Sequence, residues 1–405
     1  MTIAQDTATT LPRHDAPESI LGAYASLPES QEAQEEYYRL LARVPGVRGL
    51  EIPFRDDLAG SAGLPWLASQ LAPHWNRNIV TAIPGTMMRV WATGTFGLAS
   101  TDRQGRADAL AFTRSVRDGV EALREAAGLD VVAAFYPFQF VAEQVGGDLV
   151  QVTNLTQPGS EPHDLELTAQ QTASLGQADL VLYQTGFQAA VDDAVAQSAP
   201  KASIDVASIV PLADPVESVD LGEDDAGDDD EHFAKDPHEW LDPRNMITIT
   251  NAVRDELSEL DAEHAEQYRA NADTLVERLT RLDADFAALG ECQQKTFVTT
   301  HAAFGYLATR YGLNQIGISG LSPDEEPSPA RIARVQQLAR DNGVTTIFYE
   351  TLVSDKVASS IAGDLGLATD VLDPLEGITD QSRGDDYIEV MESNLAALRT
   401  ANRCG

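Results

Sequence analysis

Apolar residues along this chain alternate between short β-branched runs and longer stretches with helical spacing. Buried strands are expected at residues 131–136, 148–155, 297–300 and 345–350. After each run, apolar residues return every three or four positions, as on one face of a helix. The longest such stretch is 262–289, where six large apolar residues recur at helical spacing: Tyr268, Leu275, Leu279, Leu282, Phe286 and Leu289. This alternation predicts an α/β fold with parallel sheets and crossover helices.

The first third of the chain forms a group of its own. Three strand-like segments, at 19–27, 46–54 and 78–87, each precede a helical segment, at 31–43, 64–71 and 107–127. A (β/α) barrel needs eight such units, so we expect an incomplete barrel-like segment over residues 18–128. The motifs PGVRGLEIPF, IPGTMMRVW and FGLAS resemble the start of an uncharacterised family of sugar-isomerase-like barrels. Glu51, at a strand end, is expected to be structural or solvated, because the later barrel strands are missing.

The charge is concentrated in the second part of the chain. The 405 residues carry a formal net charge of −36, of which residues 1–128 contribute −3 with 15 acidic and 12 basic residues. Residues 219–236 form an acidic, low-complexity run that is expected to be a mobile loop. This excess of negative charge argues against nucleic acid or an anionic membrane surface as a partner. It would concentrate cations, and it would equally serve solubility or salt tolerance.

The chain shows no targeting or membrane-spanning pattern. No stretch approaches the roughly 20 apolar residues that span a bilayer. Residues 1–17 are polar and expected to be disordered, and they lack the basic flank and apolar core of a secretory signal. The two cysteines, Cys292 and Cys404, could form a disulfide that fastens the C-terminus or could remain free thiols. A disulfide would indicate an oxidising compartment.

Three histidines and an acidic pair occupy loops beside predicted strands and helices. His301 lies where a strand meets a helix, His163 follows a strand, and His238 precedes a helix. Asp373 and Glu376 follow another strand-like run, in TDVLDPLEG. Strand ends of this kind face the ligand crevice of open α/β sheets. Three imidazoles and one carboxylate form a tetrahedral set suited to zinc, whereas manganese favours more carboxylates and fits less well.

The remaining candidates have weaker patterns. A single histidine at a strand end is more often a hydrogen-bonded polar residue than a ligand. We expect three histidines to lie at the surface: His14, His74 and His264. His232 in the acidic run could capture metal transiently, but a solvated spacer suits its surroundings better. Glu350, which ends a strand, could support a metal ligand, cap a helix or brace a lobe.

The order of motifs over residues 129–405 resembles a known family. It reads PHDLEL, an acidic run, DPHEWLDP, a long helix, THAAFGYLATRYGL, ISGLSPDEEPSP, FYETLVSDKVA and VLDPLEG. This order resembles the zinc-binding solute receptors of bacterial metal ABC importers. The resemblance implies two α/β lobes joined by a long rigid helix, with a metal cleft between them. It assigns the ligand role to His163, His238 and His301, with Glu376 ahead of Asp373 as the fourth ligand.

The same resemblance implies a domain plan and partners. The N-terminal lobe would span 129–260, the linking helix 261–290 and the C-terminal lobe 291–405. We expect a monomeric binding protein rather than an enzyme, with zinc as cargo and the membrane permease of an ABC importer as partner. An extracytoplasmic location follows, although the missing signal leaves retention in the cytoplasm open.

Two alternatives to a receptor remain at this point. A zinc-dependent hydrolase would need an open coordination position and a base beside the metal. The N-terminal part could instead be a sugar-isomerase-like remnant, joined to the receptor part by gene fusion, deletion or a mis-assembled gene model.

Overall fold

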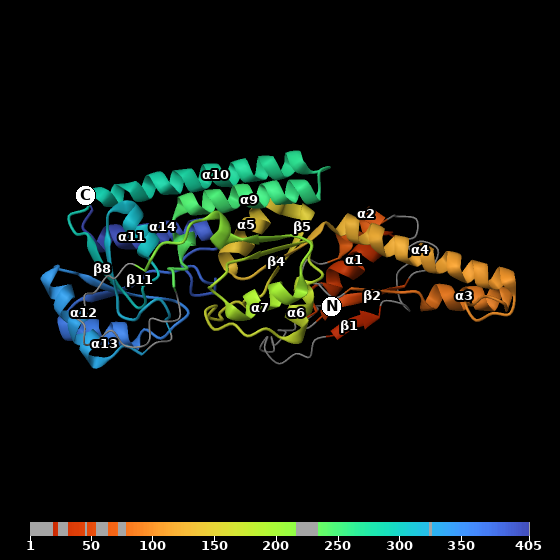
Figure 1. The fold of residues 1–405 in the computed structure, drawn as a ribbon, viewed down its shortest axis with the longest axis horizontal. Coiled ribbons are helices and arrows are strands. Elements are labelled where there is room, and N and C mark those ends of the chain that lie inside the picture. The colour runs from red at the N-terminus through yellow and green to blue at the C-terminus, as the bar shows by residue number, and fades with distance from the viewer. Residues whose placement is uncertain are drawn as a thin grey trace, which may run out of the picture. The chain divides into compact units, whose positions relative to one another are not determined.

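The computed structural model describes residues 19–22, 31–44, 47–53, 64–71, 78–215, 234–323 and 326–404. It divides into two compact units, residues 1–128 and 129–405 (Figure 1). The expectations for the first 17 residues, for His14, His74 and His232, and for nearly all of the acidic run lie outside the described residues.

The first unit is built around a parallel sheet of order β1-β2-β3. Its strands are β1 (Ser19–Gly22), β2 (Val47–Pro53) and β3 (Ile79–Thr81). Its helices are α1 (Gln31–Leu41), α2 (Leu64–Gln70), α3 (Ile83–Thr93) and α4 (Arg103–Ala127). Among the described residues, one buried cluster of this unit contains Tyr38, Leu50, Ile52 and Leu67.

The sequence-based expectation was wrong at α3. Residues 78–87 were expected to form one strand, but the strand ends at Thr81 and a helix begins at Ile83. Proline fits the first turn of a helix, where its missing N–H costs nothing, and Pro84 occupies that turn. Gly94 ends the helix with a φ of 67°, a conformation that glycine adopts easily.

The second unit holds two separate four-stranded parallel sheets, one in each lobe. The N-terminal sheet has the order β5-β4-β6-β7, with β4 at Leu129–Ala133, β5 at Val150–Asn154, β6 at Leu180–Tyr183 and β7 at Ser203–Asp205. Its helices are α5 (Tyr136–Gly146), α6 (Ala169–Leu175), α7 (Ala189–Ser198) and α8 (Val206–Ile209). Val131 of β4 pairs with Val152 of β5 on one side and with Leu180 of β6 on the other, and all three side chains are apolar.

The C-terminal lobe repeats this plan with the order β11-β10-β8-β9. Its strands are β8 (Thr296–Thr299), β9 (Asn314–Gly317), β10 (Thr346–Tyr349) and β11 (Ala368–Val371). Its helices are α11 (Gly305–Tyr311), α12 (Pro329–Asp341), α13 (Lys356–Leu365) and α14 (Tyr387–Ala401). The parallel strands and crossover helices of both lobes confirm the predicted α/β class.

Two long helices, α9 (Pro243–Leu260) and α10 (Ala265–Ala287), pack side by side along the lobes (Figure 1). Helix α10, roughly 35 Å long at 1.5 Å per residue, contacts α5 of the N-terminal lobe and α14 of the C-terminal lobe. Arg278 of α10 forms an ion pair of 2.7 Å with Asp386, at the start of α14. The helix expected over 262–289 is therefore present, three residues shorter at its start and two at its end, and it contacts both lobes.

A disulfide joins Cys292 and Cys404, whose Cα atoms lie 4.2 Å apart. It fastens the residues after α14 to the segment just before β8, and so decides between the two alternatives left open for the cysteines. Nearby, the N–H of Gln294 donates to the carbonyl of Asn402 at 3.0 Å. Among the described residues, no helix combines the length and apolar character that a membrane crossing requires.

Candidate metal centre

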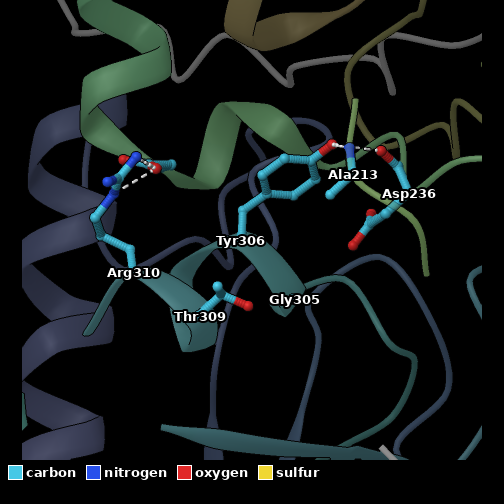
Figure 2. Close-up of a pocket in the computed structure, with 7 residues that line it drawn as sticks. Ala213, Asp236, Gly305, Tyr306, Thr309 and Arg310 are labelled. Atoms are coloured by element: carbon cyan, nitrogen blue, oxygen red, sulfur yellow. Dashed lines mark hydrogen bonds and ion pairs between the residues drawn. The ribbon is translucent and has the colours of Figure 1, made fainter. Parts of the chain in front are cut away.

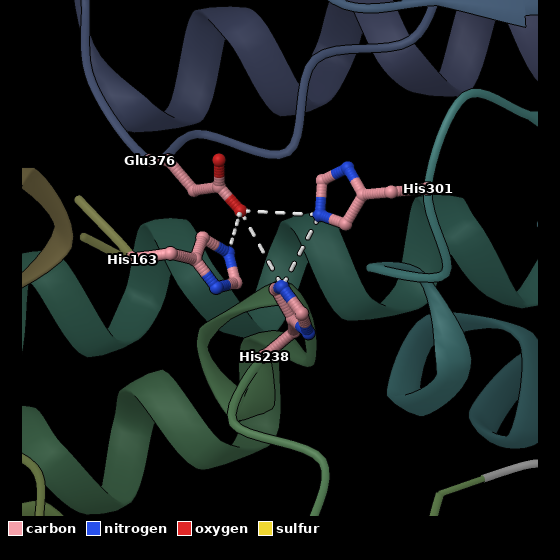
Figure 3. A group of neighbouring side chains, drawn as sticks. All are labelled: His163, His238, His301 and Glu376. Carbon is pink, nitrogen blue, oxygen red and sulfur yellow. Dashed lines mark hydrogen bonds and ion pairs between the residues drawn. The ribbon is translucent and has the colours of Figure 1, made fainter. Parts of the chain in front are cut away.

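Four side chains meet between the two lobes, and each comes from a separate loop (Figure 3). His163 follows β5, and His238 directly precedes the short 3-10 helix η4 (Glu239–Leu241). His301 follows β8, and Glu376 follows β11. Loops after parallel strands meet at one edge of their sheet, which brings His301 and Glu376 together in the C-terminal lobe. The N-terminal lobe supplies His163 and His238.

The donor atoms of these four side chains are closely spaced. Oε1 of Glu376 lies 3.2 Å from Nε2 of His163, 3.4 Å from Nε2 of His238 and 3.3 Å from Nε2 of His301. The Nε2 atoms of His238 and His301 are 3.3 Å apart, and one donor atom from each residue lies within 4.8 Å of the others. A tetrahedron with bonds of about 2.0–2.1 Å has edges of about 3.3–3.4 Å. The cluster therefore has the size of a tetrahedral zinc site.

The cluster is shielded from solvent. The exposed fraction is 0% for His238 and His301, 1% for Glu376 and 7% for His163. The aromatic rings of Phe187 and Trp240 pack beside the histidines, with centroids 4.8 Å from His163 and 5.2 Å from His238 respectively. Charged and polar groups in such an environment need partners, because water is not there to solvate them.

Two carboxylates contact the Nδ1 atoms of two of the imidazoles. Oδ1 of Asp236 lies 2.8 Å from Nδ1 of His238 and also accepts its backbone N–H at 3.0 Å. Oε1 of Glu350 lies 2.7 Å from Nδ1 of His301 and accepts its backbone N–H at 3.2 Å. Because a carboxylate can only accept, both imidazoles must donate from Nδ1, which leaves the Nε2 lone pair directed at the centre.

Asp236 is a residue of the candidate site that the sequence reasoning missed. It was assigned to the end of the acidic run, although it is 1% exposed and contacts His238 directly. The available signal was its place two residues before a candidate ligand, from which a carboxylate can reach the histidine backbone N–H. Three roles were left open for Glu350, and its contact with the candidate ligand His301 agrees with the first of them, support of a ligand.

Asp373 lies outside the cluster. Its carboxylate accepts from the N–H of Leu375 at 2.9 Å and from the hydroxyls of Thr351 and Ser382 at 3.0 and 3.2 Å. Leu375 has a φ of 59°, so the chain turns sharply between Asp373 and Glu376. Asp373 therefore supports the turn that presents Glu376. His264, as expected, is at the surface, with Nδ1 2.7 Å from Asp261.

The titration behaviour of the metal-free cluster follows from burial and charge. Burial lowers the pKa of His163. Burial also lowers the pKa of His301, but Glu350 and Glu376 raise it by more, so the net pKa lies well above the ordinary value. Burial raises the pKa of Glu376, but His301 and His163 lower it by more, and Glu376 stays ionised. Protons and a metal cation thus compete for the same buried position.

The family described as zinc-uptake complex component A, periplasmic, matches residues 131–401. The chain belongs to this family. A domain of unknown function, DUF4862, matches residues 20–136, in agreement with a separate N-terminal segment. The resemblance inferred from the motifs is therefore confirmed for the receptor part of the chain.

Relatives in the zinc-uptake family are zinc-binding proteins by name. The zinc-binding lipoprotein AdcA of Streptococcus pneumoniae is 37% identical over 276 residues, which cover 67% of this chain and 55% of AdcA. This chain thus spans about half the length of AdcA. The high-affinity zinc uptake system protein ZnuA of Bacillus subtilis is 33% identical over 67% of this chain and 86% of its own.

Solved structures that are similar to this chain have the same fold. Zn(II)-bound AdcA from S. pneumoniae aligns with a TM-score of 0.58 and 36% identity, covering 68% of this chain and 58% of AdcA. The laminin-binding protein Lmb of Streptococcus agalactiae, described as an adhesin with metal-transporting activity, aligns with a TM-score of 0.60 and 30% identity, covering 68% of this chain and 99% of Lmb. Both alignments confirm the two-lobed α/β architecture.

Proposed function

We propose that this protein binds one zinc ion tightly between its two lobes and delivers it to the permease of an ABC importer. The ligands would be His163 and His238 from the N-terminal lobe and His301 and Glu376 from the C-terminal lobe. The observation that carries the proposal is the convergence of these four donors within 4.8 Å of one another, with four of their separations at 3.2–3.4 Å, close to the edge of a tetrahedral zinc site.

The donor set favours zinc over manganese. Neutral imidazole suits zinc, and a single carboxylate is too few for a manganese site. Copper would bind the same donors more tightly, so selectivity against copper must come from metal supply and cavity shape. The zinc named in the descriptions of AdcA and ZnuA supports this choice.

A receptor role agrees with the geometry better than hydrolysis does. Catalytic zinc sites keep one position open for water, whereas four protein donors here would close the coordination shell. All four donors come from one chain, which supports a monomeric receptor. The described residues of the first unit form a sheet of three parallel strands, and we propose no function for this unit.

We place the protein outside the cytoplasm. Its family is described as periplasmic, and its relative AdcA is named a lipoprotein. The disulfide between Cys292 and Cys404 supports the same location, because disulfides persist in oxidising compartments.

Calorimetric titration of the whole chain with zinc tests the proposal. We expect one site in the native protein, loss of tight binding in His238→Ala, and native binding in His264→Ala, which removes an exposed histidine. Tight binding that survives His238→Ala would refute the ligand assignment. Ester or peptide hydrolysis by the zinc-loaded protein would favour the hydrolase instead.

A further inference from the structure

Helix α11 of the C-terminal lobe holds the segment that carries His238. We define the His238 segment as residues 236–242, which belong to the N-terminal lobe. The hydroxyl of Tyr306 donates to the carbonyl oxygen of Asp236 at 2.9 Å and accepts the N–H of Ala213 at 2.7 Å. Figure 2 shows this bridge, with Tyr306 directed from α11 toward Ala213 and Asp236.

The other end of the His238 segment is held by the same helix. Nε of Arg310 lies 2.7 Å from Oδ2 of Asp242, and Nη2 of Arg310 lies 2.5 Å from the same oxygen. Asp242 is also the N-cap of α9, where it accepts the N–H of Arg244. Tyr306 and Arg310 are four residues apart, so they lie on one face of α11 and reach the two ends of the segment together.

The space between these two contacts is not filled by side chains. A cavity of about 240 Å³ lies there, lined by residues that include Asp236, Tyr306, Thr309 and Arg310 (Figure 2). Both ends of the segment also have contacts within the N-terminal lobe: the N–H of Asp236 donates to the carbonyl oxygen of Ala213 at 2.9 Å, and Asp242 caps α9. The contacts with α11 link these two ends to the C-terminal lobe. The middle of the segment is held differently, because Nε1 of the fully buried Trp240 donates to the carbonyl oxygen of Pro374 at 2.8 Å.

Tyr306 connects to the metal centre through one residue. Its bond to the Asp236 carbonyl fixes the backbone of the residue whose carboxylate holds Nδ1 of His238. Burial raises the pKa of Tyr306, so its hydroxyl keeps the proton that it donates. Helix α11 also begins only four residues after His301, so one short element positions ligands from both lobes.

We propose that Tyr306 and Arg310 form an interlobe clamp, which positions His238 against His301 and sets how fast bound zinc escapes. The proposal rests on the zinc-binding function proposed above. All four candidate ligands are buried, so zinc cannot leave until one ligand loop moves. The His238 segment is the loop that α11 contacts at both ends, and opening the clamp removes a contact that positions Asp236, whose carboxylate orients the His238 ring.

The chain offers a matched control on the same helix. Tyr311 also belongs to α11, and its hydroxyl donates to Asp283 of α10 at 3.0 Å rather than to a residue of the His238 segment. Both tyrosines lose one hydroxyl and keep the ring on substitution by phenylalanine. The two variants therefore differ in whether the lost contact reaches the metal centre.

The test is stopped-flow measurement of zinc dissociation into excess chelator, using the whole chain. Tyr306→Phe loses two hydrogen bonds, and we expect dissociation to become about tenfold faster with little change in the association rate. Tyr311→Phe should change the dissociation rate less than about twofold. We expect it to lower the melting temperature of the metal-free protein about as much as Tyr306→Phe does. Cobalt-loaded Tyr306→Phe should keep the native absorption spectrum, because the ligands are unchanged.

The outcomes separate this proposal from the function on which it rests. A native dissociation rate in Tyr306→Phe, together with one-site zinc binding, would overturn the clamp and leave the receptor function standing. Equal acceleration in both tyrosine variants would mean general destabilisation and would also overturn it. Failure of the native protein to bind zinc would instead refute the function itself. If Tyr306→Phe does not fold, Arg310→Gln carries the test with the same expected direction.

Discussion

Substituting Glu350 by glutamine should weaken zinc binding without removing any metal ligand. Oε1 of Glu350 lies 2.7 Å from Nδ1 of His301 and also accepts the His301 N–H, and the hydroxyl of Thr300 contacts the same oxygen. The Glu350→Gln variant keeps an oxygen that accepts from Nδ1 and loses the negative charge. The imidazole of His301 then becomes a weaker donor to the metal, because its Nδ1–H is less polarised.

The size of the effect follows from the kind of bond that is weakened. A hydrogen bond to a charged group contributes about 1.5–3 kcal/mol, and a neutral one about 0.5–1.5 kcal/mol. The difference is about 1–1.5 kcal/mol, close to a tenfold change in the dissociation constant for zinc. This lies at the lower end of the roughly 10–100-fold loss seen when carboxylates behind metal ligands are removed.

The same substitution should change the pH dependence of binding. Glu350 raises the pKa of metal-free His301, so in the native protein a proton competes with zinc increasingly as the pH falls. Glutamine removes part of that increase and thereby weakens the competition. The tenfold deficit of Glu350→Gln should therefore be largest at alkaline pH and should narrow as the solution is acidified.

Competition with a chromogenic chelator at several pH values measures both effects. Glu266→Gln serves as the control, because Glu266 is exposed and pairs only with the nearby Arg269 among the contacts that the structure describes. Native affinity of Glu350→Gln at alkaline pH would refute the reasoning. A deficit that widens on acidification would refute the proposed competition between protons and zinc.

Three further predictions concern protons, the disulfide and the acidic pair. Zinc binding near neutral pH should release about one to two protons, because neighbouring carboxylates raise the pKa of His238 and His301 above ordinary values despite burial. Calorimetry in buffers of different ionisation enthalpy measures this release, and a heat independent of buffer would contradict it. Replacing Cys292 and Cys404 together by serine should lower the free energy of unfolding in urea by about 2–5 kcal/mol while zinc stoichiometry stays at one. An unchanged unfolding midpoint would show that the cross-link adds no stability. In chelator competition, Glu376→Gln should weaken zinc binding at least about tenfold more than Asp373→Asn, which retains most contacts of the supporting turn; equal losses would mean that the two acids share the role.

The local pattern of residues determined much of this protein. Strand and helix positions could be predicted because burial on a sheet or a helix face imposes a period on neighbouring residues. The prediction failed at residues 83–87, because the composition of IPGTM is compatible with the end of a strand. Pro84 lies in a first helical turn only because β3 has already ended at Thr81. The candidate histidines could also be proposed from sequence, since loops after parallel strands share one edge.

Only the tertiary structure decided how distant segments meet. Asp373 and Glu376 are three residues apart in similar surroundings, and the positive φ of Leu375 directs one to a supporting turn and the other to the cluster. The pairing of Cys292 with Cys404 depends on where α14 ends relative to β8. The contacts of Asp236 and Tyr306 arise because the chain returns to the same place after 70 residues. Local propensity acts over a few residues, whereas these choices depend on the packing of whole lobes, which no short stretch of sequence encodes.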